Sequence, residues 1–172
     1  MEDLRVRDAT VEDTEAIVSA TVEAWRTAYR GIVADDHLRE LPIERWHHEI
    51  AVGLRRPVAD SFTRVAEIDG AFAGYCYVAA PSSGEATGPE TAELVAIYVL
   101  PEHWSLGAGG ALMGVALEHL ADLGYADVYL WTFAENERAI AFYERHGWSL
   151  DGAEKIHPRT QAPAVRLRRP IP

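Results

Sequence analysis

The sequence predicts a mixed α/β fold, because segments with strand-like and helix-like hydrophobic patterns follow one another along the chain. LRVRDA, residues 4–9, reads as a short strand, and a helical pattern follows it. Residues 62–68 and 71–80 alternate apolar and polar side chains around Asp69-Gly70, a pair typical of two-residue hairpin turns. Strands and helices interleaved in this way indicate a sheet with helices packed on it.

The other elements follow in order. A helix is expected over residues 11–29, with Thr10 as a candidate N-cap, and a second helical region over about 35–54. After the hairpin, ELVAIYVL reads as a buried strand. The remaining predicted elements are a helix that ends near Leu123, the strand VYLWTF, a helix from Glu137 to His146 closed by Gly147, and two final strands.

Length and composition fit one domain over residues 1–172. The net charge of −11 argues against a nucleic-acid surface and is compatible with a cationic small substrate. No apolar run before residue 101 approaches the roughly 20 residues of a membrane span, and MEDLRVRD is too polar for a signal peptide. We therefore expect a cytoplasmic protein with no membrane partner, in which the lone Cys76 is a small buried side chain.

Three glycines fall within four positions of HWSLGAGGALM, residues 103–113, between a strand and a helix. A dinucleotide-binding G-x-G-x-x-G would need glycine at Leu112, and a P-loop would need Lys followed by Ser or Thr where Val-Ala follows Gly114. Both of these nucleotide-binding motifs fail on spacing or residue type.

A serine-hydrolase elbow, G-x-S-x-G, is approached around Ser105 in a strand-turn-helix context. His103 stands where the first glycine belongs, so this reading is kept only as an alternative. Its candidate bases are His119, His146 and His157.

The glycine stretch leaves backbone N–H groups at a helix N-terminus unshielded by side chains, which makes it a candidate anion site. A tight strand-helix turn that needs glycine only for its left-handed backbone explains the loop equally well. The residues of this candidate site are Ser105, Leu106, Gly107, Ala108, Gly109 and Gly110.

ELVAIYVLPEHWSLGAGGALM, followed after a helix and a strand by NERAIAFYERHGW, resembles the GNAT superfamily of N-acetyltransferases. Members carry Q/R-x-x-G-x-G/A after the fourth strand, and residues 104–109 match it except that Trp104 replaces Gln or Arg. The resemblance implies acetyl-CoA as co-substrate, a primary amine as acceptor, no metal, and a mostly antiparallel mixed sheet of about seven strands with flanking helices.

The resemblance also implies roles for single residues. Tyr143 matches the usual general acid, and a phenol near pKa 10 can protonate a leaving thiolate near pKa 8.5. Glu93 stands where the family often carries a carboxylate that faces the acceptor, although an exposed strand-start charge fits it equally well. The backbone at Ile97 and Val99 would pair with the pantetheine arm, and Asn136, a candidate helix cap, would contact the cofactor.

The first two helices should select the acceptor. They offer aromatic and acidic side chains suited to a cation, and a place in the core is the alternative role for some of the aromatic ones: Trp25, Tyr29, Asp35, Asp36 and Trp46. His47-His48-Glu49 lacks metal-ligand spacing and reads as a solvated helix face. A non-catalytic acyl-CoA-binding module is the rival to an enzyme, a homodimer is allowed, and nothing in the sequence identifies the amine.

Overall fold

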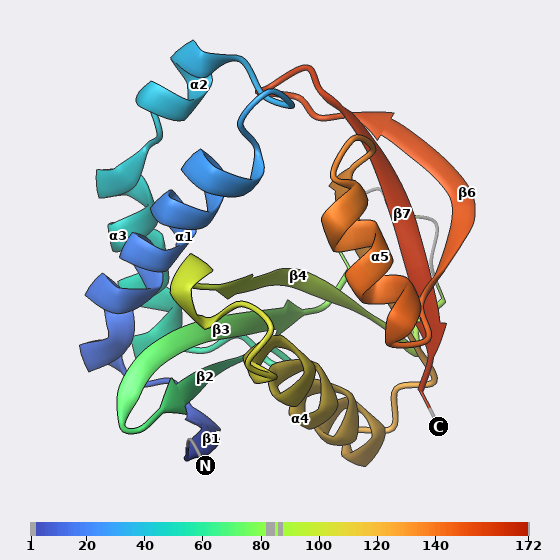
Figure 1. The fold of residues 1–172 in the computed structure, drawn as a ribbon. Coiled ribbons are helices and arrows are strands. Elements are labelled where there is room, and N and C mark those ends of the chain that lie inside the picture. Colours follow the sequence, from blue (N-terminus) through green and yellow to red (C-terminus); the bar gives the residue numbers. More distant parts are fainter. Residues whose placement is uncertain (1–2, 82–84, 86–87, 172) are drawn as a thin grey trace.

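The computed structural model describes residues 3–81, 85 and 88–171. In this part of the chain, seven strands form one sheet in the order β1-β2-β3-β4-β5-β7-β6. Only β4 and β5 pair in parallel, so the predicted mixed and mostly antiparallel sheet is confirmed (Figure 1). The strands are β1 (Leu4–Asp8), β2 (Phe62–Ile68), β3 (Ala71–Ala79), β4 (Thr91–Val99), β5 (Asp127–Phe133), β6 (Ser149–Ile156) and β7 (Pro163–Pro170).

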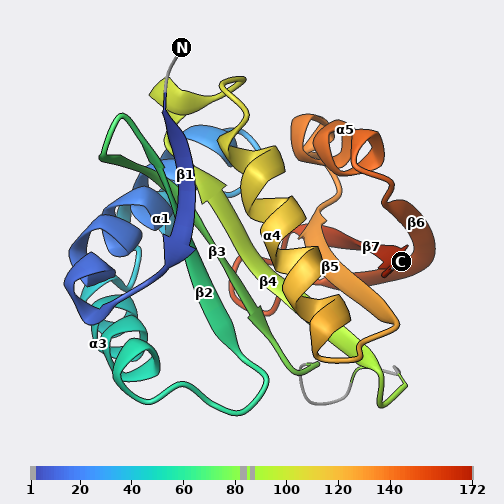
Figure 2. The same cartoon turned by 90° about the horizontal axis from the view of Figure 1, so that it is seen from below.

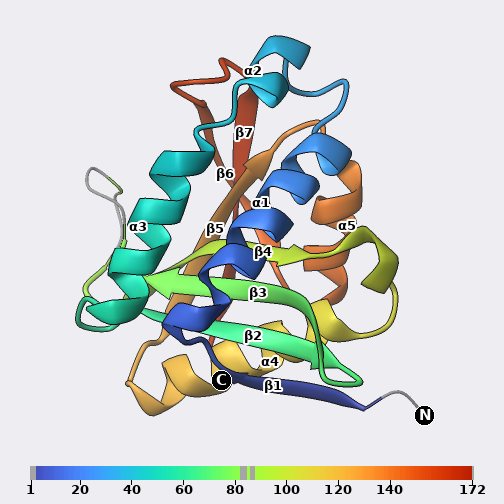
Figure 3. The same ribbon diagram turned by 90° about the vertical axis from the view of Figure 1, so that its left-hand side faces the viewer.

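Helices cover both faces of the sheet. Two of them, α1 and α3, lie on one face (Figure 3), and α4 runs across the other face (Figure 2). None of the described helices is long and apolar enough to cross a membrane. The helices are α1 (Thr14–Ala28), α2 (Asp35–Arg39), α3 (Ile43–Arg55), α4 (Ala108–Asp122) and α5 (Glu137–Arg145), with 3-10 turns η1 (Val11–Asp13) and η2 (Pro101–His103).

The second predicted helical region is two helices, α2 and α3, rather than one. Pro42 lies between them, and a proline lacks the N–H that would continue the hydrogen-bond ladder and disfavours helical backbone at Leu41 before it. The first helix also starts later than predicted, at Thr14, because the preceding turn is the 3-10 segment η1. The Asp13 carboxylate accepts the Thr10 N–H there, at 2.7 Å.

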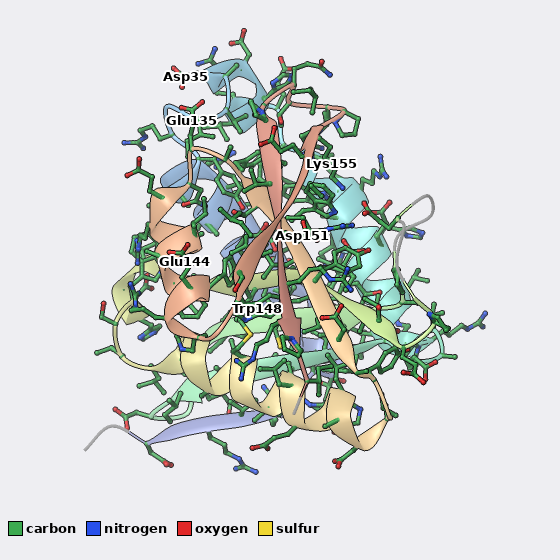
Figure 4. All side chains as sticks on the ribbon, turned by 90° about the vertical axis from the view of Figure 1, so that its right-hand side faces the viewer. Asp35, Glu135, Glu144, Trp148, Asp151 and Lys155 are labelled. Atoms are coloured by element: carbon green, nitrogen blue, oxygen red, sulfur yellow. The ribbon has the colours of Figure 1, made fainter. Side chains whose placement is uncertain are left out.

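Successive residues of β2 point to opposite faces of the sheet and join different core clusters. In β2, Val65 packs with the α1 side chains, whereas Ala66 belongs to the larger cluster beneath α4 and α5. Cys76 lies in that larger cluster with no exposed surface, and burial raises the pKa of its thiol to about 12, so it is the inert side chain expected from the sequence. Trp148, labelled in Figure 4, follows α5 and is buried in the same cluster.

The central strands approach each other unusually closely at Gly74. A Cβ atom there would lie 2.5 Å from the Tyr98 carbonyl oxygen and 2.9 Å from Val99 Cα. Further along the same pair of strands, the register shifts: Tyr77 faces Ala96, but the next residue of β3 faces Leu94. Val95 is therefore the extra residue of a β-bulge, which bends β4 and exposes this side chain.

β4 and β5 pair over only three residues and then separate. Thr91, Ala92 and Glu93 pair with β5, and the rest of β4 has no partner on that side in the part of the chain that the structure describes. Figure 2 shows the two strands running apart beneath the N-terminal half of α4. The fold thus contains an internal sheet edge, next to the start of α4 and to α5.

Candidate active site

A cavity of about 500 Å³ occupies the space where β4 and β5 separate. Its walls come from the end of α1, the unpaired part of β4, the glycine turn and one face of α5. A volume of this size is typical of small-molecule sites. The sequence-predicted residues that line it are Tyr29, Ile97, Val99, Ser105, Gly107, Gly109, Gly110, Asn136 and Tyr143.

The glycine turn presents backbone donors to this cavity. Gly107 is the N-cap of α4 with φ of +90°, and Ser105 is also left-handed with φ of +67°. Among the described residues, the N–H groups of 108–110 have no acceptor, as is usual in the first turn of a helix. The helix dipole adds about half a positive charge at this end, so the turn suits an anion. The glycine turn therefore has both features: a left-handed backbone, and N–H groups that suit an anion.

Gly109 has a further reason to be glycine. A Cβ atom on it would lie 3.1 Å from the Phe142 ring and 3.7 Å from Val99. The missing side chain lets α5 approach the start of α4, and this contact narrows the cavity. A larger residue at this position would disturb Phe142 as well as any ligand, so Gly109 variants cannot test phosphate binding alone.

The described cavity wall carries basic side chains and no acidic ones. In a chain with a net charge of −11, the described lining residues include no carboxylate. The acidic side chains labelled in Figure 4 (Asp35, Glu135, Glu144 and Asp151) are instead exposed outside it. The basic lining residues are His103, Arg138, Arg145 and His146. A site this polarised fits an anionic ligand.

Arg138 and Trp104 form a stacked pair at the cavity wall. The guanidinium carbon lies 3.2 Å from the centroid of the Trp104 ring, and the indole N–H donates to the Val99 carbonyl at 2.8 Å. Partial burial lowers the pKa of Arg138, and no carboxylate in the described residues pairs with it. The cation is held in place by the ring and lacks a counter-ion.

Tyr143 reaches the cavity from the buried face of α5. Its side chain is 9% exposed, and burial, with a smaller contribution from nearby Tyr98, raises the pKa of the phenol. The hydroxyl is therefore protonated at neutral pH, as a proton donor must be. Asn136 starts this helix: its side-chain oxygen accepts the Ala139 N–H at 3.3 Å, which confirms the predicted cap.

Two further tyrosines lie side by side on the cavity wall. The Tyr29 and Tyr98 hydroxyls lie 3.4 Å apart, and the Trp25 indole N–H donates to Tyr98 at 3.2 Å. Burial raises the pKa of both phenols. Trp25 itself does not line this cavity; it lies behind Tyr98 in a second cavity on the helix side of the sheet.

Glu93 occupies the last paired position of β4, opposite Tyr129 of β5. It is 7% exposed, which contradicts a solvated strand-start charge, and its carboxylate accepts the Tyr129 hydroxyl at 2.9 Å. The adjacent Leu94 and Val95 line the cavity, whereas Glu93 lies just behind them. The carboxylate is placed where the strands part, one residue from the cavity wall.

Several predicted residues lie elsewhere. Leu106 is exposed and Ala108 is buried against the core, so neither lines the cavity. Asp35 and Asp36 are exposed on α2, and Asp36 pairs with Arg39.

The serine-hydrolase alternative gains no support from the structure. Ser105 has no hydrogen bond from its hydroxyl to a histidine within the described residues. His146, the candidate base that lines the described cavity wall, instead bonds through Nδ1 to the Phe142 carbonyl at 2.7 Å.

The sequence reasoning missed the basic residues of α5 and Tyr98. A signal was available, because Arg138, Phe142 and Arg145 recur at helical spacing on the face that the glycine turn must meet. Tyr98 was hidden by the apolar run around it, in which every residue looks like core.

Comparison with known proteins adds an independent line of evidence. A family model described as the acetyltransferase (GNAT) family matches residues 18–148. The uncharacterized N-acetyltransferase YuaI of Bacillus subtilis (strain 168) is 30% identical over 141 residues, which cover 82% of this chain and 78% of that protein. A mycothiol acetyltransferase of Nocardiopsis dassonvillei is 27% identical over 168 residues, but the chain spans only 48% of its length.

Solved structures agree on the fold. The PaiA N-acetyltransferase from Thermoplasma acidophilum in complex with coenzyme A has a TM-score of 0.80 at 18% identity. The match covers 98% of this chain and 99% of that one, so the likeness extends over the whole sheet and its helices.

Proposed function

Because the chain belongs to the GNAT family of acetyltransferases, we propose that it moves an acetyl group from acetyl-CoA to a primary amine of a small-molecule or peptide acceptor. The observation that carries the proposal is the basic cavity at the parting of β4 and β5, lined by no described carboxylate in an acidic chain. The N–H groups at the start of α4 and the basic side chains suit the phosphates of coenzyme A. The unpaired edge of β4 suits its amide-bearing arm.

When bound, acetyl-CoA supplies a thioester whose carbonyl carbon forms a bond to the amine nitrogen while the bond to sulfur breaks. Tyr143 then donates its phenolic proton to the departing sulfur. Burial raises the pKa of the phenol, but the same surroundings would raise that of a thiol, so the transfer stays nearly balanced. The proton lost from the amine goes to Glu93, through water because that carboxylate lies behind the cavity wall.

The test is a thiol-release assay with acetyl-CoA and a panel of amines, run beside thermal melts. Acetyl-CoA at about 100 times its dissociation constant should stabilise the protein by about 2.7 kcal/mol, which a melt detects. Thiol release that depends on an amine supports the enzyme. A melting shift with no thiol release for any amine would favour a non-catalytic acyl-CoA-binding module, and the lack of both would reject the cofactor assignment.

A further inference from the structure

A second cavity, of about 570 Å³, lies on the opposite face of β4 from α4, between the sheet and the helices α1 and α3. Most of its wall is aromatic or aliphatic, including Trp25, Trp46, Tyr75, Ile50 and Leu54. We call it the helix-side cavity. A cavity of this volume holds a drug-sized molecule. Such a molecule would bind mainly through the burial of its apolar surface.

The helix-side cavity and the cavity between β4 and β5 adjoin along β4 at the β-bulge. Val95, Ala96 and Tyr98 line both of them. The bulge exposes Val95 to 47%, so the strand that separates the two spaces is thin and irregular at this point. A ligand in the helix-side cavity would therefore lie one strand away from the cavity between β4 and β5.

The charges of the helix-side cavity are already neutralised. Its charged lining residues are Asp8, Glu49 and Arg64; Arg64 forms an ion pair with Asp8, and Glu49 pairs with Arg45 at 2.7 Å. No unpaired carboxylate remains within the described wall to attract a second positive charge. The cavity thus discriminates against polyamines and favours a large apolar group.

Gly53 keeps the wall of this cavity open. It lies inside α3, where a glycine costs about 1 kcal/mol relative to alanine, and it is one of the lining residues. A Cβ atom on it would meet nothing within 4 Å, so close packing does not require the glycine, and its backbone is not left-handed. The absence of a side chain at Gly53 leaves open space at this part of the cavity wall.

We propose that the helix-side cavity binds the body of the acceptor, and that the acceptor is a primary amine with an aromatic or large aliphatic group. This inference rests on the proposed function. The apolar group contacts Trp25 and Trp46, and the amine lies at Tyr98, which lines both cavities. The acidic residues of α2, exposed and outside both cavities, take no part in acceptor recognition.

The experiment compares phenethylamine and tryptamine with ethanolamine and spermidine in the thiol-release assay. We expect kcat/KM for phenethylamine to exceed that for ethanolamine by about tenfold or more, because its ring is buried. Gly53→Phe should fill the cavity and reduce kcat/KM for phenethylamine about tenfold or more, with an unchanged acetyl-CoA shift in thermal melts. Gly114→Phe is the matched control, since Gly114 is also a helical glycine with open space around it but lines neither cavity.

If Gly53→Phe does not fold, Gly53→Leu places a smaller side chain in the same cavity. Quenching of tryptophan fluorescence by phenethylamine measures acceptor binding without turnover, and Gly53→Phe should abolish it. A kcat/KM for ethanolamine or spermidine that equals or exceeds that for phenethylamine would overturn the proposal. Full activity of Gly53→Phe toward phenethylamine would overturn it as well. So would a wild-type protein that binds acetyl-CoA but neither acetylates nor is quenched by the aromatic amines. If acetyl-CoA does not raise the melting temperature, the proposed function is rejected. The fluorescence quenching would still show whether the helix-side cavity binds an aromatic amine.

Discussion

The guanidinium of Arg138 stacks on the ring of Trp104, with 3.2 Å between its central carbon and the ring centroid. Trp104 stands at the position where the family signature has Gln or Arg, and Arg138, in the first turn of α5, places a cation over its ring. The indole N–H is occupied by the Val99 carbonyl, which fixes the ring as a platform. We propose that Arg138, supported by the Trp104 ring, takes the part of the signature residue.

We therefore predict that Arg138→Gln weakens acetyl-CoA binding. A charge-assisted hydrogen bond contributes about 1.5–3 kcal/mol, which corresponds to a loss of about tenfold to a hundredfold in affinity. Calorimetric titration with acetyl-CoA would measure it. Arg55→Gln, at the end of α3 and outside the cavity, is the control and should bind normally. Equal affinity of Arg138→Gln and wild type would remove Arg138 from the site.

Tyr143→Phe should lower kcat by at least about tenfold with little change in KM for acetyl-CoA. The substitution keeps the ring that packs against Trp148 and removes only the proton donor. Steady-state kinetics with an amine acceptor would separate the two parameters. A raised KM with kcat preserved would make Tyr143 a binding residue instead.

Glu93→Gln tests the proposed proton acceptor. A glutamine carbonyl can still accept the Tyr129 hydroxyl that now bonds to Glu93 at 2.9 Å, so the fold should be kept. Loss of a general base typically costs about 10² to 10⁴ in rate, and we expect kcat at pH 7 to fall by at least about tenfold. Melting temperatures would show whether the variant is intact. Unchanged kcat in a folded variant would assign the proton to bulk water.

Gly74→Ala should destabilise the protein and loosen the site together. Its Cβ atom would collide with backbone at Tyr98 and Val99, both of which line the cavity, and overpacking of this kind costs about 1–3 kcal/mol. We expect a lower melting temperature and weaker acetyl-CoA binding in the same variant. Gly114→Ala, in open space on α4, should instead stabilise by up to about 1 kcal/mol.

The start of α1 gives a pH-dependent prediction. Arg7 donates two hydrogen bonds of 2.8 Å to Asp13 and, more than any other contact, lowers the pKa of that carboxyl. Because the folded-state pKa is depressed, the stabilisation is present above the unfolded pKa near 3.9 and is lost as pH falls through the folded value. Asp13→Asn should lower the melting temperature by about 3–10 °C at pH 7, and the difference from wild type should shrink below about pH 4. A difference of the same size at pH 2 as at pH 7 would exclude this ion pair as its cause.

Much of the fold could be predicted from local signals. Asp69 and Gly70 both adopt left-handed backbone at the predicted hairpin turn, and Gly147, with φ of +82°, ends α5 as expected. These features depend on one or two residues and their neighbours. The break at Pro42 was equally local, but the apolar pattern on either side of it continued at helical spacing and concealed it.

The site was less predictable, because its features depend on distant segments. The Val95 bulge arises from the register between two strands, and the close approach of Gly109 to Phe142 joins two helices. Neither has a sequence signature. The burial of Glu93 likewise required its neighbour on β5.

The short parallel pairing of β4 with β5 also bears on how the protein unfolds. The backbone pairing between the strands before the gap and those after it is limited to three residue pairs, and the two halves of the sheet are otherwise held together by the core that they share beneath α4 and α5. A ligand lying along the unpaired edge would span this seam. Occupancy of the site would then add a second connection between the two halves, in addition to raising the temperature at which the protein melts.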